Sequence, residues 1–101
     1  MKYLHVLISA EGTEEAGKIL DALLEKKLIT GGPILQGPAK FWWKGEIVKM
    51  DYAYILTYTM EKHKQAIIDT VKQVSSEEVP MISFIPFEGN KELEDYISSV
   101  V

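Results

Sequence analysis

Cysteine and arginine are both missing from this sequence of 101 residues. Without cysteine the chain can form neither a disulfide nor a thiolate metal site, and it has no cysteine nucleophile. All 11 basic residues are lysines, so the bidentate clamp by which arginine holds phosphate is absent, which argues against acylphosphatase-like hydrolysis. Only two histidines occur, and no pattern of serine, histidine and acid stands out. We therefore expect a protein that is not an enzyme.

Long apolar runs and an excess of positive charge are also lacking. The first residues, MKYLHVLIS, pass into AEGTEEAG, and this start is too short and too acidic for a signal peptide. No run approaches the length of a membrane span, so we expect no membrane partner and a cytoplasmic protein. A net charge of −4 argues against nucleic acid as a partner. The length suits one hydrophobic core, so residues 1–101 are expected to form a single domain.

The stretch Phe41–Thr59, FWWKGEIVKMDYAYILTYT, contains both tryptophans and predicts a long β-hairpin. Two extended runs meet at Lys44-Gly45, which predicts a two-residue turn. Antiparallel pairing then sets Trp43 opposite Glu46, Trp42 opposite Ile47, Phe41 opposite Val48 and Lys40 opposite Lys49. Because the last pair opposes two like charges, a bulge or a slipped register stays open.

This hairpin is predicted to protrude from the rest of the protein. A strand from Glu46 to Thr59 would span roughly 45 Å at about 3.3 Å per residue, whereas a compact domain of this length is roughly 33 Å across. The aromatic residues Phe41, Trp42 and Trp43 would then lie on an exposed ribbon. Such a ribbon is an aggregation hazard in a monomer, so we expect other subunits to cover it.

The remaining elements flank the hairpin on both sides in the sequence. They are predicted as a strand over Tyr3–Ser9, a helix capped by Thr13, an edge strand over Leu28–Gln36, a helix over Glu61–Val74, a proline-containing edge strand over Val79–Phe87, and a last helix capped by Asn90. The order β-α-β-β-α-β-α, with right-handed crossovers, predicts an α+β fold. It is the ferredoxin-like β-α-β-β-α-β sandwich, with a long protruding hairpin and a C-terminal helix.

Two motifs resemble one known family along essentially the whole chain. Residues 42–47 read Trp-Trp-Lys-Gly-Glu-Ile at the hairpin tip, and residues 78–80 read Glu-Val-Pro at the start of the last strand. With the strand and helix order, they resemble the CutA divalent-cation tolerance family. The resemblance implies a ferredoxin-like fold and a tight homotrimer in which the hairpins wrap neighbouring subunits. It also implies a role linked to copper and other divalent cations.

The sequence departs from the family where polar and metal-capable groups are usual. Residues 30–33 read Thr-Gly-Gly-Pro where the family has Ala-Cys-x-Asn, and residues 75–77 read Ser-Ser-Glu where it has His-Pro-Tyr. Tyr52 stands where the family has an acid, and Tyr58 where it has a lysine. Glu78, Pro80 and the tryptophan pair are retained. A degenerate scaffold without a metal site is therefore an open alternative.

The resemblance places a candidate binding cleft between subunits. Its candidate residues are Tyr52, Tyr58, His63 and Glu78, and its expected ligand is a divalent cation such as copper, or a small molecule. Glu78 is preferred over Glu77 because adjacent residues of an extended segment point to opposite faces and only Glu78 matches the family. The metal and any other cofactor stay unknown.

A second reading is an RNA-binding module, because the RNA-recognition motif has the same order of elements and displays aromatics on its sheet. The missing K/R-G-F/Y-G/A-F-V-x-F/Y signature and the negative charge argue against it.

Overall fold

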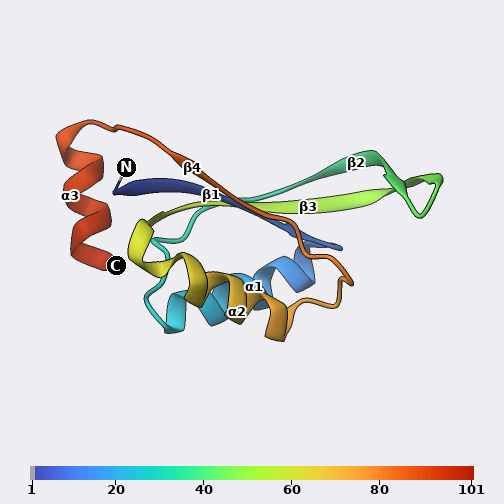
Figure 1. Ribbon diagram of the computed structural model, residues 1–101, viewed down its shortest axis with the longest axis horizontal. Helices are drawn as coiled ribbons and strands as arrows, with labels where there is room; N and C mark the ends of the chain where they lie inside the picture. The colour runs from blue at the N-terminus through green and yellow to red at the C-terminus, as the bar shows by residue number, and fades with distance from the viewer. Residues whose placement is uncertain (1) are drawn as a thin grey trace.

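The computed structural model describes residues 2–101 and contains one four-stranded antiparallel sheet and three α-helices (Figure 1). Along the chain the elements are β1 (Tyr3–Ala10), α1 (Thr13–Glu25), β2 (Ile34–Trp43), β3 (Glu46–Met60), a 3-10 turn (Glu61–His63), α2 (Lys64–Val74), β4 (Ile82–Pro86) and α3 (Lys91–Val100). The strand order across the sheet is β2-β3-β1-β4. This arrangement confirms the predicted α+β, ferredoxin-like fold.

The hydrophobic core lies between one face of the sheet and helices α1 and α2 (Figure 1). Alternation along β1 buries every second side chain, because successive residues of a strand point to opposite faces. The fully buried side chains at this interface include Val6 and Ile8 of β1, Ile55 of β3, Ile19 and Leu23 of α1, and Ile67 and Val71 of α2. The helices therefore cover one face of the sheet.

The hairpin formed by β2 and β3 has the predicted turn and register. Trp43 pairs with Glu46 and Lys40 with Lys49, without a bulge or a slip. Lys44 and Gly45 both have positive φ, 50° and 81°, which is the conformation of a two-residue type I′ turn. The molecule measures 44 × 24 × 20 Å, and the hairpin projects well beyond the helices (Figure 1). The predicted protrusion is confirmed.

Several element boundaries differ from the predictions. Helix α1 is preceded by Gly12, and Thr13 is its first residue and makes no capping hydrogen bond. Strand β4 begins only at Ile82; at Met81 the N–H donates to the Ser9 hydroxyl (2.9 Å) rather than to a backbone carbonyl of β1. At the last helix the prediction is confirmed, since the side chain of Asn90 accepts from the N–H of Leu93 (3.0 Å).

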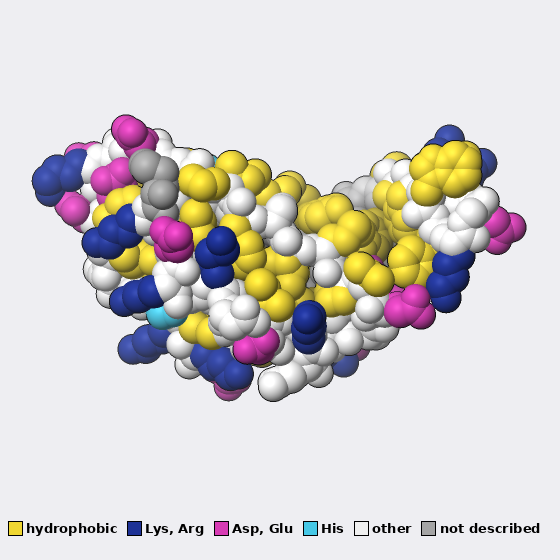
Figure 2. All heavy atoms as spheres, in the orientation of Figure 1, with side chains coloured by type: hydrophobic (Ala, Val, Ile, Leu, Met, Phe, Trp, Pro, Cys, Tyr) yellow, Lys and Arg dark blue, Asp and Glu magenta, His cyan; other side chains and the backbone are white. Residues whose placement is uncertain are grey.

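Within residues 2–101, neither α1 nor α2 covers the second face of the sheet. Strand pairing puts Leu35, Leu56 and Ile85 on this open face, and these side chains are 36–55% exposed. Figure 2 shows hydrophobic side chains over the middle of the molecule and along the hairpin. Helix α3 lies at the end of the sheet opposite the hairpin tip (Figure 1). In the described residues, no helix combines the length and the apolar character that crossing a membrane requires.

Candidate functional site

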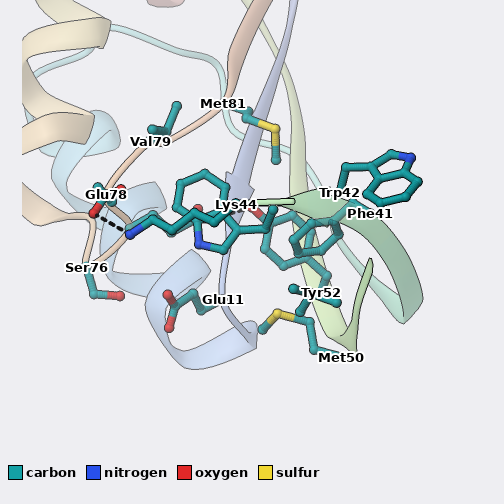
Figure 3. A pocket seen from close by; sticks show the side chains of 13 residues that line it. Glu11, Phe41, Trp42, Lys44, Met50, Tyr52, Ser76, Glu78, Val79 and Met81 are labelled. Carbon is teal, nitrogen blue, oxygen red and sulfur yellow. Dashed lines mark hydrogen bonds and ion pairs between the residues drawn. The ribbon is translucent and has the colours of Figure 1, made fainter. Parts of the chain in front are cut away.

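A pocket of about 430 Å³ lies between the distal half of the hairpin and the segment that leads into β4 (Figure 3). One wall comes from the hairpin residues Phe41, Trp42, Trp43, Lys44, Val48, Met50 and Tyr52. The other comes from Ser76, Glu77, Glu78, Val79 and Met81, with Glu11 from the loop before α1. The pocket therefore joins apolar and aromatic side chains with three carboxylates and one ammonium group.

A hydrogen-bonded network joins the two walls. The hydroxyl of Tyr52 donates to Glu77 Oε2, and the hydroxyl of Ser9 donates to Glu77 Oε1 (2.9 Å). Tyr52 is only 6% exposed. Burial raises the pKa of the Tyr52 phenol well above its ordinary value, and the hydrogen bond to Glu77 raises it further. The phenol therefore stays protonated and fixes the Glu77 carboxylate against the hairpin.

The loop that carries the carboxylates is attached to the first turn of α1. Glu15 accepts hydrogen bonds from the backbone N–H groups of Ser76 and Glu11. Partial burial raises the pKa of the Glu15 carboxyl, but these hydrogen bonds outweigh it and lower the pKa below its ordinary value. Within the loop, the N–H of Glu77 donates to the Ser75 hydroxyl (3.1 Å). Glu15 thus holds the loop in place.

At the rim, the hairpin turn contacts the same loop. Lys44 Nζ lies 3.4 Å from Glu78 Oε1 and 5.5 Å from the centre of the Trp43 ring (Figure 3). The side chains of Lys44 and Glu78 are 66% and 63% exposed. An ion pair between exposed groups contributes little stability, so this contact can open at low cost.

The structure brings together two of the four predicted cleft residues, Tyr52 and Glu78. Tyr58 lies six residues further along β3, roughly 20 Å away at 3.3 Å per residue, and its ring packs on His5 with centroids 5.0 Å apart. His63 lies just before α2. Within one chain the four residues therefore do not form one cleft.

His63 has an unusual environment of its own. Burial and the charge of Lys62 lower the pKa of its imidazole. Its Nε2 atom is buried, and it has no hydrogen-bond partner in the described part of the chain. The imidazole is therefore held in its neutral form, away from the pocket.

Sequence reasoning overlooked Ser9 and Lys44, and it set Glu77 aside in favour of Glu78. The preference for Glu78 rested on an extended strand, but residues 75–81 form an irregular loop, where side chains do not alternate between two faces. Both glutamates line the pocket, and it is Glu77 that contacts Tyr52. The sequence feature that could have indicated this network is Ser9, a hydroxyl residue near the end of an otherwise apolar strand.

The carboxylates of the pocket do not form a preassembled metal site. Among residues 2–101 there is no group of three or more His, Cys, Asp or Glu side chains placed to hold an ion. Carboxylate oxygens suit hard cations, and soft or borderline metals such as copper favour imidazole and thiolate ligands. The donor set of one chain therefore does not fit a tight copper site.

Fold and pocket together define a ferredoxin-like α+β protein with a long hairpin that forms one wall of a carboxylate-lined pocket. The sequence model of the "CutA1 divalent ion tolerance protein" family matches residues 4–100. This chain belongs to that family, and the predicted resemblance is confirmed.

Individual relatives agree over nearly the whole chain. The divalent-cation tolerance protein CutA of Archaeoglobus fulgidus is 38% identical over 98 residues, which cover 95% of each chain. The CutA protein of Thermococcus kodakarensis is 28% identical over 89 residues, which cover 87% of this chain and 86% of the relative.

Two solved structures show the same fold. The structure of the periplasmic divalent cation tolerance protein CutA from Archaeoglobus fulgidus superimposes with a TM-score of 0.91, at 32% identity and 97% coverage of both chains. The Cut A1 protein of Thermus thermophilus superimposes with a TM-score of 0.90, at 28% identity and 97% coverage of both chains.

Proposed function

We propose that this protein acts in divalent-cation tolerance as a non-catalytic homotrimer. The observation that supports self-association is the uncovered apolar surface of the single chain, and the number of three subunits is taken from the resemblance to the family. Trp42 is 73% exposed and Ile47 is 57% exposed at the hairpin tip, and the open face of the sheet adds further apolar area. Soluble proteins rarely leave a long apolar ribbon exposed, so neighbouring copies are the economical cover.

A non-catalytic role is supported by the state of the polar groups in the pocket. The Ser9 hydroxyl is fully buried; it donates to Glu77 and accepts from Met81, so it is engaged on both sides. The Tyr52 phenol is held protonated. Activation of a nucleophile requires a base that is free to take its proton, whereas the Glu77 carboxylate beside Ser9 is already held by the Tyr52 phenol.

We propose that divalent cations bind weakly at the loop of Glu77 and Glu78, with ligands completed by a neighbouring subunit. Glu78 is the freer carboxylate, because among the described residues its side chain forms an ion pair with the exposed ammonium of Lys44 alone. Two carboxylates from one chain are too few for a tight site. We therefore expect copper or zinc affinities in the micromolar range or weaker.

Calorimetric titration of copper and zinc tests this proposal. The parent, Glu78→Gln and a control, Glu14→Gln, are compared; Glu14 is an exposed carboxylate on α1 that pairs only with Lys18 (3.8 Å). We expect Glu78→Gln to weaken binding and Glu14→Gln to leave it unchanged. Nanomolar affinity, or binding that is indifferent to Glu78, would place the metal chemistry elsewhere.

A further inference from the structure

The pocket already contains an organic cation, the protein's own Lys44 ammonium. Lys44 Nζ lies over the Trp43 ring, 5.5 Å from its centre. It also lies 3.4 Å from the Glu78 carboxylate (Figure 3). An ammonium group placed over an indole face and beside a carboxylate has the geometry by which proteins recognise organic ammonium ions. The Lys44 ammonium thus occupies the position that the ammonium group of a bound ligand would take.

The charge of the pocket favours a second cation over an anion. Three carboxylates line it, from Glu11, Glu77 and Glu78, against the single ammonium of Lys44. Glu77 is fixed by Tyr52 and Ser9, whereas Glu78 has only the exposed contact with Lys44. An anion would meet net repulsion here, because like charges at short range in a partly enclosed site are unfavourable.

The apolar walls favour an organic cation over a bare metal ion. Phe41 packs against Tyr52 with ring centres 5.3 Å apart, and the apolar wall also includes Val48, Met50, Val79 and Met81. A metal ion gains nothing from such surface, whereas an alkyl chain buried on it is stabilised by the hydrophobic effect. The volume of about 430 Å³ also lies in the range of small-molecule sites.

We propose that this pocket binds small primary alkylammonium ions, with the ammonium between Glu78 and Trp43 and the alkyl chain on the apolar wall. Lys44 is then a tethered competitor that leaves when the ligand enters. This inference rests on the proposed binding role of the pocket and names its ligand class. It predicts that removal of the Lys44 ammonium strengthens binding.

The turn geometry offers a variant that removes this ammonium and keeps the hairpin. Lys44 has φ of 50°, a left-handed conformation that asparagine adopts more readily than lysine, and Asn-Gly is a favoured pair in type I′ turns. Lys44→Asn should therefore fold at least as well as the parent. The control is Lys18→Ala, which removes the same charge and a similarly exposed ion pair, with Glu14, on α1.

The test is a titration with n-pentylammonium chloride at constant ionic strength, followed through the indole N–H resonances of the two tryptophans. The neutral control ligand is 1-pentanol, which has the same alkyl chain. We expect a saturable shift of the Trp43 resonance with pentylammonium, and binding of pentanol at least tenfold weaker. Lys44→Asn should bind about two- to fivefold more tightly, the range that loss of one exposed ion pair allows, and Lys18→Ala should match the parent.

The role of Glu78 is tested in a variant that lacks the Lys44 ammonium, so that loss of the ion pair with Lys44 does not affect the result. The double variant Lys44→Asn/Glu78→Gln is compared with Lys44→Asn alone, and weaker pentylammonium binding is expected. Equal affinity for pentanol, no saturable shift, or no loss in the double variant would overturn the inference. The copper titration on the same samples separates the two proposals, because metal binding without amine binding refutes the ligand class alone.

Discussion

Replacement of Gly32 by alanine should destabilise the protein strongly, because the backbone of β3 passes directly against this residue. A Cβ atom built at Gly32 would lie 2.0 Å from the carbonyl oxygen of Leu56, whereas real Cβ contacts essentially never fall below 3.0 Å. The obstacle is rigid backbone, since Leu56 lies on a strand that also pairs with β1, at Leu7. The segment containing Gly32 must therefore move.

The cost follows from the hydrogen bonds that tie this segment to β3. The N–H of Thr30 donates to the Tyr58 carbonyl (3.1 Å), the N–H of Leu56 donates to the Pro33 carbonyl (3.2 Å), and the Thr57 hydroxyl donates to the Gly31 carbonyl (3.0 Å). Each contributes about 1 kcal/mol net. Displacement of the segment would break all three, so we expect Gly32→Ala to lower the free energy of unfolding by about 3 kcal/mol.

Urea unfolding followed by circular dichroism measures this change, at one protein concentration because oligomer formation makes stability concentration-dependent. The control is Gly17→Ala on α1, where an added Cβ meets no atom within 4 Å. That variant should be neutral or more stable by up to about 1 kcal/mol, since alanine favours helix. If Gly32→Ala has the same free energy of unfolding as the parent, the close approach of Gly32 to the β3 backbone is wrong.

Two further predictions concern the pocket. Because the pKa of Glu15 is lowered in the folded state, its contribution to stability is present above its ordinary value of 4.5 and lost as pH falls through the folded pKa. Glu15→Gln should therefore unfold more readily than the parent in urea at pH 7 and match it near pH 2, and an equal gap at both pH values would contradict this. Tyr52→Phe removes the bond to Glu77 and should cost about 1–2 kcal/mol at pH 7. The parent's raised phenol pKa gives a contribution that is complete below pH 10.0 and lost as pH rises through the folded pKa. As the pH is raised above 10.0, the free energy of unfolding measured in urea should therefore fall more for the parent than for Tyr52→Phe. If it falls equally for both proteins, this assignment is refuted.

The fold could be predicted from sequence because its signals are local. Lys44-Gly45 between two apolar runs determines the hairpin turn, and the turn determines every pair in the register. The length of the second strand predicted that the hairpin protrudes, because that strand is longer than a compact domain of this size is wide. Asn90 likewise identifies the start of the last helix, since its side chain bonds within its own turn.

The candidate site was less predictable because it depends on contacts across the sequence. Glu77 meets Ser9 across 68 residues and Tyr52 across 25, and an irregular loop gives no period from which its direction could be read. Sequence reasoning also grouped Tyr58 and His63 with Tyr52, although the length of β3 separates them within one chain. Family resemblance predicted the scaffold, whereas the pocket contains Tyr52 and Glu77, at positions where the sequence departs from the family pattern.

The homotrimer is the central claim, because the exposed hairpin, the open face of the sheet and a shared cation site all depend on it. Light scattering coupled to size-exclusion chromatography, at micromolar protein concentration, measures the mass directly. The monomer has a mass of 11.4 kDa, so a trimer should give three times this value, about 34 kDa. A single species near 11.4 kDa would contradict the account.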